Sequence, residues 1–270
     1  MDLNTIFNRL WSDYVSRTPS AKKIVDLFSR EGEAIVNDHI AFRTLDYPGI
    51  GIDVIARPFL QNGYESRGEY EFVDKHLFAK HFELPGNPGA PRVFISQLLL
   101  SNFSEFLQKS LTAELASIPP EMFDSANLIF SGSFIKPLSH GVYNDLREES
   151  EYAAWFYVFG FRANHFTISV NALKKYNHIL KVNQLLRENG FVLNSSGGEV
   201  KGTEMDFLQQ TSTLADIIPV EFAEGTFGIP SCYYEFAQRY PMPDGKLFNG
   251  FVVQSANRIF ESTDYYKKMK

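Results

Sequence analysis

Two short stretches of the chain, residues 36–44 and 162–170, resemble one another, and both have the composition of buried strands. Their sequences are VNDHIAFRT and RANHFTISV, and the Val, Ile, Phe and Thr in them favour an extended backbone. Each contains one histidine, His39 or His165, with an asparagine close before it. A single histidine on such a strand is usually a hydrogen-bonded core residue. Two in similar surroundings favour the interpretation that the stretches supply two halves of one metal site.

The segments that follow these two stretches repeat in the same order. The first is followed by a predicted helix at 50–61 and by predicted strands between 64 and 100. The second is followed by a predicted helix at 172–188 and by predicted strands at 191–194, 206–215, 220–222 and 231–238, with a loop at 224–230. An Asn-Gly pair ends each helix. This repetition indicates two related modules packed side by side.

We therefore expect one α+β domain over residues 1–270. Module one covers about 35–100 and module two about 160–245, and their sheets curve around a shared cavity. The segment of about 101–158 between them is predicted to be a helical insertion, because Phe and Leu recur there at helical spacing. Two amphipathic helices within residues 3–31 precede module one, and the tail ends in a short helix.

Composition and charge exclude several classes of function. The chain has a formal net charge of −6, whereas a general nucleic-acid binder would present a basic surface to phosphates. No apolar run is long enough to cross a membrane, and the amphipathic N-terminus contains acidic residues, unlike a signal peptide. Cys232 is the single cysteine, so an intramolecular disulfide is excluded and a reducing compartment is favoured. We expect a soluble, cytoplasmic protein.

The strand pattern places several polar side chains on one surface of the cavity. Alternate residues of a strand share a face, so His39 and Arg43 point the same way, with Ala41 between them. At about 3.3 Å per residue, His39 and Arg43 are roughly 13 Å apart. Glu235 lies in the middle of the apolar stretch SCYYEFAQ, where an unpaired carboxylate would be costly to bury. Two histidines and one carboxylate with open positions are typical of a non-haem Fe(II) site.

Other polar residues have competing interpretations. His76 and His81 adjoin lysines on a strand that we expect to be exposed. His140 follows a loop and is more often structural, with a role in a lid as the alternative. Gln210, in LQQTSTLAD, either reaches the cavity or is a structural amide. Three further glutamates compete with Glu235 for the carboxylate position: Glu199, Glu204 and Glu221.

Four motifs together resemble one known family. NDHIAFRT, RANHFTISVN, GGEVKGTEMDFLQQTSTLAD and IPSCYYEFAQRYP are similar to the 2-oxoadipate dioxygenase/decarboxylase family, and the likeness covers roughly residues 35–98 and 160–245. The resemblance implies two βαβββ modules of the vicinal-oxygen-chelate type. It also implies an enzyme that uses Fe(II) and O2 to convert 2-oxoadipate into 2-hydroxyglutarate and CO2 in lysine breakdown.

The resemblance further implies roles for individual residues. On the family's pattern, His39, His165 and Glu235 are the iron ligands. Arg43 binds the substrate carboxylate remote from the 2-oxo group, which suits a guanidinium because its planar fork donates two parallel hydrogen bonds. Gln210 is a second candidate for substrate binding. Two alternatives stay open: a metal-dependent isomerase or lyase of the same architecture, which needs no O2, and a non-catalytic protein that binds small molecules.

Overall fold

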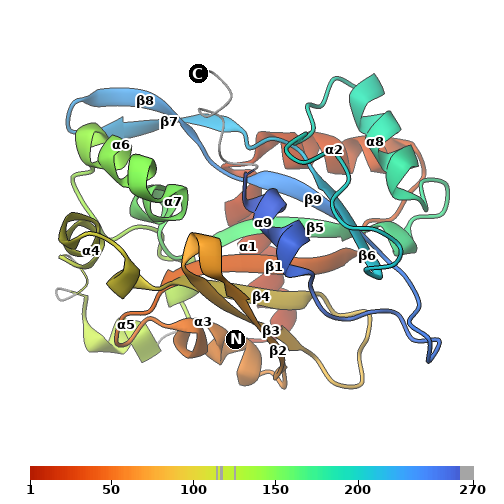
Figure 1. Ribbon diagram of the computed structural model, residues 1–270, viewed down its shortest axis with the longest axis horizontal. Helices are drawn as coiled ribbons and strands as arrows, with labels where there is room; N and C mark the ends of the chain where they lie inside the picture. The colour runs from red at the N-terminus through yellow and green to blue at the C-terminus, as the bar shows by residue number, and fades with distance from the viewer. Residues whose placement is uncertain (114, 116–117, 125, 262–270) are drawn as a thin grey trace.

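One large mixed sheet organises the computed structural model, which describes residues 1–261 except 114, 116, 117 and 125 (Figure 1). Its seven strands have the order β2-β3-β4-β1-β5-β9-β6. The central strand β1 (Asn37–Leu45) is parallel to β4 (Arg92–Leu98) and antiparallel to β5 (Ala163–Ser169). β9 (Tyr233–Arg239) is parallel to β5. Parts of the predicted insertion and of the predicted tail lie outside the described residues.

The two halves of the sheet repeat one arrangement around β1 and β5. In the first half, β4 pairs antiparallel with β3 (Leu77–Glu83), which pairs antiparallel with β2 (Glu65–Phe72). In the second half, β9 pairs antiparallel with β6 (Leu208–Ser212). Helix α3 (Ile52–Leu60) follows β1 in the chain, and α8 (Ile179–Glu188) follows β5. The predicted α+β fold with a shared curved sheet is confirmed.

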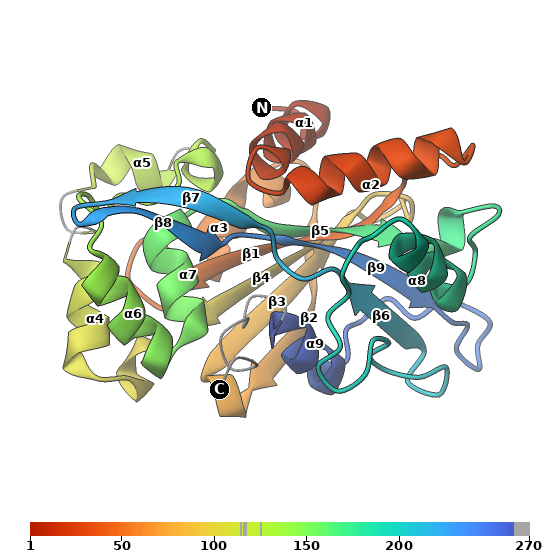
Figure 2. The ribbon, with the colours of Figure 1, turned by 90° about the horizontal axis from the view of Figure 1, so that it is seen from above.

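The sheet curls so far that both of its edge strands contact the same helix. Helix α9 (Val253–Phe260) contacts β2 and β6, which stand at opposite ends of the strand order. Helices α1 (Leu3–Val15), α2 (Pro19–Arg30) and α3 cover the other, convex face (Figure 2). The concave face is therefore enclosed by α9 and by the strands that curve around it.

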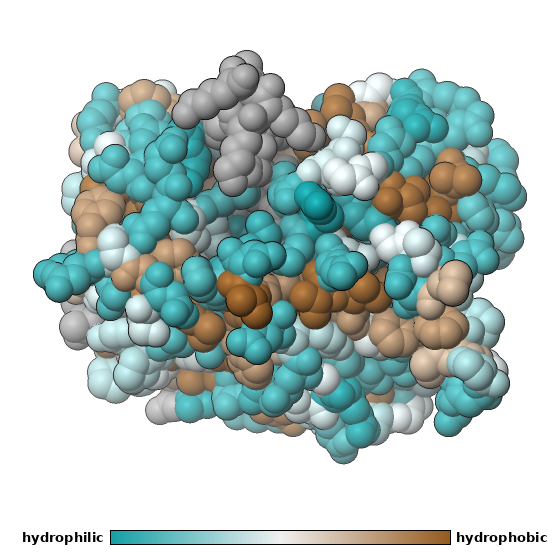
Figure 3. Space-filling model, in the orientation of Figure 1, coloured by the Kyte–Doolittle hydropathy of each residue, from teal (hydrophilic) through white to brown (hydrophobic). Residues whose placement is uncertain are grey.

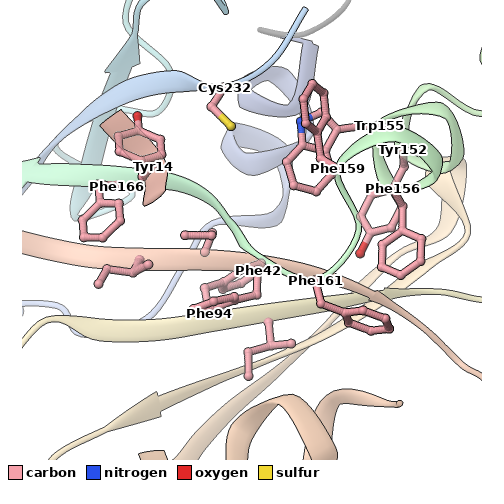
Figure 4. Packing of buried hydrophobic residues seen from close by; sticks show 14 of the residues in the cluster. Tyr14, Phe42, Phe94, Tyr152, Trp155, Phe156, Phe159, Phe161, Phe166 and Cys232 are labelled. Carbon is pink, nitrogen blue, oxygen red and sulfur yellow. The ribbon is translucent and has the colours of Figure 1, made fainter. Parts of the chain in front are cut away.

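Helices occupy the segment between β4 and β5 and lie at one end of the sheet (Figure 1). They are α4 (Glu105–Thr112), α5 (Pro120–Asp124), α6 (His140–Glu149) and α7 (Glu151–Phe159). Of these, α7 has every residue from Tyr152 to Phe159 buried. Figure 4 shows its aromatic side chains gathered at one end of the core, with Tyr14 and Phe166 at the other. Cys232 is buried in the same core.

A separate hairpin corrects the predicted loop at 224–230. β7 (Ile217–Phe222) and β8 (Gly225–Pro230) pair antiparallel along their whole lengths outside the main sheet. The sequence GTFGIP of β8 contains two glycines and a proline, which are depleted in strands and are typical of loops. The predicted strand at 191–194 is also wrong, because that segment contributes one isolated bridge, between Leu193 and Thr213.

The predicted helix at 172–188 begins later than expected, at Ile179. Glu33 lies in the segment between α2 and β1. It accepts hydrogen bonds from the backbone N–H groups of residues 174–176. These bonds hold the chain in a turn. His178 then caps the helix by accepting from the N–H of Leu180. A carboxylate distant in sequence thus sets the start of α8.

One face of the molecule is mainly hydrophilic. On the face shown in Figure 3, hydrophilic side chains predominate around scattered apolar patches. No helix among the described residues is long and apolar enough to span a bilayer.

Candidate metal centre

Strand register brings the three candidate ligands together on the concave face. His39 on β1 pairs with Thr167 on β5, which pairs with Glu235 on β9, while His165 lies in the next row. All three side chains are buried, with residue exposures of 1%, 4% and 1% for His39, His165 and Glu235. The Glu235 oxygens lie 3.4 Å from His39 Nε2 and 3.4 Å from His165 Nε2. One ligand atom from each residue falls within 4.8 Å of the other two, so the three residues could hold one metal ion.

Two β-bulges place a short polar side chain beside each histidine. The pairing of β1 with β5 skips Asp38 on one strand and Asn164 on the other. A bulged residue leaves the strict alternation of the strand. His39 Nδ1 therefore donates to Asp38 Oδ1 at 2.8 Å, and His165 Nδ1 donates to Asn164 Oδ1 at 3.0 Å. With Nδ1 as donor, each imidazole directs the lone pair of Nε2 toward Glu235, which is how metal-binding histidines are oriented.

Sequence reasoning missed the roles of Asp38 and Asn164. The only signal is their position immediately before a histidine. Ordinary alternation would put each of them on the face opposite to the histidine. The bulges that reverse this arise from pairing between residues more than 120 positions apart.

Burial controls the charge of all three candidate ligands. It lowers the pKa of His39, and it lowers the pKa of His165 well below its usual value. Both imidazoles are therefore neutral, the form that binds metal ions. Burial raises the pKa of Glu235 to about 8. A divalent cation between the three residues would offset the cost of keeping that carboxylate ionised.

Gln210 lines the same small cavity as the three candidate ligands and contacts Glu235. Its Nε2 donates to Glu235 Oε1 at 2.5 Å, so the amide orients the carboxylate. A role for Gln210 in substrate binding stays a prediction. Of the glutamates that competed with Glu235, none is buried: Glu199, Glu204 and Glu221.

Asp38 connects His39 to a buried arginine. Its Oδ2 and Oδ1 accept hydrogen bonds from Arg239 Nε and Nη2 at 2.7 and 2.8 Å. Burial alone would raise the pKa of Asp38, but the charge and hydrogen bonds of Arg239 hold it far below its usual range. Arg239 Nη1 in turn donates to the backbone carbonyls of Phe248 and Gly250 at 2.9 and 2.8 Å. The carboxylate that orients His39 is thus tied to residues 248–251, which we call the strap.

The strap covers the candidate ligands from the concave side. Arg92 Nη2 donates to Asn249 Oδ1 at 2.6 Å, and the N–H of Phe251 donates to the Tyr70 hydroxyl at 3.1 Å. The Phe251 ring lies edge-on to His39, with 4.9 Å between ring centroids. The cavity left beside the ligands is about 20 Å³, room for about one water molecule.

Arg43 lines a second, larger cavity next to α7. Its residue exposure is 2%, and its guanidinium carbon lies 4.8 and 5.0 Å from the ring centroids of Tyr152 and Trp155. This cavity has a volume of about 340 Å³ and also contains Leu77 and Phe103. The charge of Arg43 still contributes, after burial and His39, to the lowered pKa of His165. The structure therefore places Arg43 near the candidate ligands but in a neighbouring cavity.

The prediction that His81 is exposed is wrong. Its exposure is 3%, because β3 is an inner strand and His81 pairs with Phe94 on β4. His81 Nδ1 accepts from the Tyr70 hydroxyl at 2.8 Å, and its Nε2 donates to Glu83 Oε1 at 3.0 Å. His76 is exposed, as predicted. His140 stacks on Phe227, with ring centroids 3.6 Å apart.

The chain matches a family defined by its chemistry. A protein-family model described as 2-oxoadipate dioxygenase/decarboxylase matches residues 6–129 and 121–247. The chain belongs to this family. A relative named 2-oxoadipate dioxygenase/decarboxylase from Arabidopsis thaliana is 37% identical over an alignment of 285 residues. The alignment covers 96% of this chain and 76% of that protein.

Solved structures of similar proteins agree with this membership. The hydroxyglutarate synthase from Oryza sativa, solved in complex with 2-oxoadipate, is 35% identical with a TM-score of 0.92, covering 98% of this chain and 93% of that one. A protein from Shewanella frigidimarina described as a putative hydrolase is 47% identical with a TM-score of 0.87, covering 93% and 97%. A putative glyoxalase superfamily protein from Ralstonia eutropha, at 19% identity and a TM-score of 0.73, covers 90% and 83% and shares the fold.

Proposed function

We propose that this protein is an Fe(II)-dependent 2-oxoadipate dioxygenase/decarboxylase. It converts 2-oxoadipate, or a similar 2-oxo dicarboxylic acid, and O2 into 2-hydroxyglutarate and CO2, as a step in lysine breakdown. The observation that carries the proposal is the buried group of His39, His165 and Glu235 in a chain of this family. The solved Oryza sativa relative with bound 2-oxoadipate supports the substrate class.

The donor set fits Fe(II). Two neutral imidazoles and one carboxylate face one point and leave coordination positions for a substrate. Asp38, Asn164 and Gln210 each hold one of the three side chains in orientation. When bound, iron supplies the redox chemistry that allows O2 to react with an organic acid.

The protein's own residues bind the substrate and exclude water. Arg43 binds the carboxylate far from the 2-oxo group, and the aromatic rings of Tyr152 and Trp155 hold its guanidinium in place. Phe251 and Phe94 shield the ligands from solvent. A cavity of about 20 Å³ does not admit a six-carbon acid. Substrate binding therefore requires the strap and α9 to shift.

Product identification tests the proposed reaction. Protein loaded with Fe(II) without oxygen is mixed with 2-oxoadipate and then exposed to O2. We expect one O2 consumed and one CO2 released for each 2-hydroxyglutarate, measured with an oxygen electrode and by mass spectrometry. An isomerase or lyase would change the substrate without O2, and a binding protein would leave it unchanged.

Replacing the candidate ligands tests the metal site. His39→Ala, His165→Ala and Glu235→Ala each remove one of three ligand atoms, so each variant should lose most of its bound iron and its turnover. The His76→Ala variant, which removes an exposed imidazole at the Arg43 cavity, is the control for metal binding and should retain its iron. Iron content is measured by plasma mass spectrometry. A ligand variant that keeps stoichiometric iron would contradict the assignment of that residue.

A further inference from the structure

Tyr233 is a buried phenol beside the candidate metal ligands. Its residue exposure is 0%, and its ring stacks on His165 with centroids 4.8 Å apart and planes inclined by 26°. Its hydroxyl has no hydrogen-bond partner among the described residues. Burying a hydroxyl without a partner costs free energy. A ligand that accepts this hydrogen bond would account for the arrangement.

Strand register places Tyr233 in the row of His165, next to the row that holds His39 and Glu235. Thr167 lies between His39 and Glu235 in one row across the sheet. In the next row, His165 lies between Ala41 and Tyr233. Along β1, this row lies between the row of His39 and the position of Arg43. An acid that extends from the metal ligands to Arg43 must cross this second row. Ala41 has the smallest side chain of this row, and Tyr233 lies at its other end.

We propose that the Tyr233 hydroxyl donates a hydrogen bond to an oxygen at the 2-oxo acid end of the substrate. The proposal rests on the proposed function. A phenol is a good donor, and the C1 carboxylate and the keto oxygen of a 2-oxo acid are both acceptors. The bound acid satisfies a donor that the described protein leaves unpaired. Tyr233 thus adds affinity for the end of the acid held by the metal, whereas Arg43 acts on the far end.

The next residue of the same strand offers a matched control. Tyr234 also has a residue exposure of 0% and a hydroxyl with no partner among the described residues. It faces the convex side, where its ring lies 5.8 Å from Trp11 and 6.2 Å from Tyr14 between centroids. An unpartnered hydroxyl alone therefore does not identify a substrate contact. The position of Tyr233 on the concave face does.

Tyr233→Phe and Tyr234→Phe each delete one buried, unpartnered hydroxyl and keep the ring. Each variant is loaded with Fe(II) without oxygen and titrated by calorimetry with 2-oxoadipate and with 2-oxohexanoate, which lacks the far carboxylate. For Tyr233→Phe we expect Kd to rise by about tenfold or more with both acids, as for a lost hydrogen bond to a charged acceptor. For Tyr234→Phe we expect an unchanged Kd. Iron content and Tm of both variants should not fall below those of the parent.

Three results would overturn this assignment. One is a Kd of Tyr233→Phe within twofold of the parent for both acids. Another is a rise confined to 2-oxoadipate, since the hydroxyl would then serve the far carboxylate. The third is an equal rise in Tyr234→Phe. If the parent protein binds neither acid, the proposed function itself is overturned. If the parent converts 2-oxoadipate and Tyr233→Phe binds both acids as tightly as the parent does, only the role of Tyr233 is overturned.

Discussion

Two of the partners of Asp38 matter for different reasons. It accepts a hydrogen bond from His39, which orients the imidazole, and a two-pronged ion pair from Arg239, which holds the strap. Both contacts are buried, and the side chains of Asp38 and Arg239 are each 3% exposed. Removing one partner of such a pair leaves the other charged and buried. The site and the strap therefore depend on the same carboxylate.

We expect Asp38→Asn to affect stability and metal binding together. The unpaired Arg239 should lower the free energy of unfolding by about 3–5 kcal/mol. The loss of the charged acceptor at His39 should weaken iron binding by about 10–100-fold. Urea unfolding and competitive chelator titration measure the two effects.

The control for Asp38→Asn is Asp53→Asn. The Asp53 side chain is 79% exposed and lies 3.3 Å from Lys80. Exposed ion pairs contribute about 0–1 kcal/mol, so this variant should differ little from the parent. Equal effects of the two substitutions would contradict the role given to Asp38.

Arg43 determines which acids the site accepts, if it binds the far carboxylate. Arg43→Lys loses the two-pronged donor and Arg43→Ala also loses the charge, so both should keep iron and lose turnover of 2-oxoadipate, Ala more severely. The loss should be on the order of 2–5 kcal/mol in transition-state stabilisation. Comparing kcat/KM for 2-oxoadipate and 2-oxohexanoate measures it. Equal losses on the two acids would mean that Arg43 supports the fold or the metal instead.

At the scale of elements, the β7–β8 hairpin and α6 are joined by one glutamate. Glu224, in the turn of the hairpin, accepts from the Ser139 hydroxyl at 2.7 Å and from the His140 N–H at 2.9 Å. An anion at a helix N-terminus satisfies free N–H groups and is favoured by the helix dipole. His140 then stacks on Phe227 of β8, so the hairpin and the helix hold each other.

This contact predicts a pH dependence of stability. The hydrogen bonds from His140 and then Ser139 lower the pKa of Glu224 from 4.5 to about 2. A lowered pKa in the folded state means that the stabilisation is present above pH 4.5 and is lost as the pH falls toward 2. Urea midpoints of the parent and Glu224→Gln, measured from pH 7 to pH 3, should therefore converge at acid pH. A constant difference over this range would contradict the capping role.

Elements whose own residues decide their structure could be predicted. The strand predicted at 36–44 is β1 at Asn37–Leu45, and that at 162–170 is β5 at Ala163–Ser169, because Val, Ile, Phe and Thr in both stretches favour an extended backbone. Elements that depend on partners outside their own segment could not. Glu33 delays the start of α8, and β8 is a strand because β7 lies beside it. Neither influence is visible in the local sequence.

At the scale of the whole molecule, the candidate site combines distant parts of the chain. The repeat predicted that His39, His165 and Glu235 approach one another, because equivalent strands of two modules meet at the centre of one sheet. It could not predict the bulges at Asp38 and Asn164, which come from the register between β1 and β5. It could not predict the strap either, since Arg239 holds it by backbone carbonyls that carry no sequence signal.

Metal binding should stabilise the whole fold. A ligand that binds only the folded state at 100 times its Kd adds about 2.7 kcal/mol. For a chain of this size that corresponds to a rise in Tm of about 5–10 °C. Differential scanning fluorimetry of metal-free protein with added Fe(II), kept without oxygen, measures the shift. Glu235→Ala should show no such shift, and an equal rise in that variant would mean that iron binds elsewhere.

The order of the strands also has a consequence for biosynthesis. β1 and β5 are complete by residue 169, but β9, which carries Glu235 and covers the outer edge of β5, is among the last strands to leave the ribosome. Until then, a nascent chain has both histidines but no carboxylate, and β5 is an open edge that can pair with other chains. A product truncated before Tyr233 would therefore lack iron and be prone to aggregation. The bound metal would mark a chain whose synthesis and folding have both been completed.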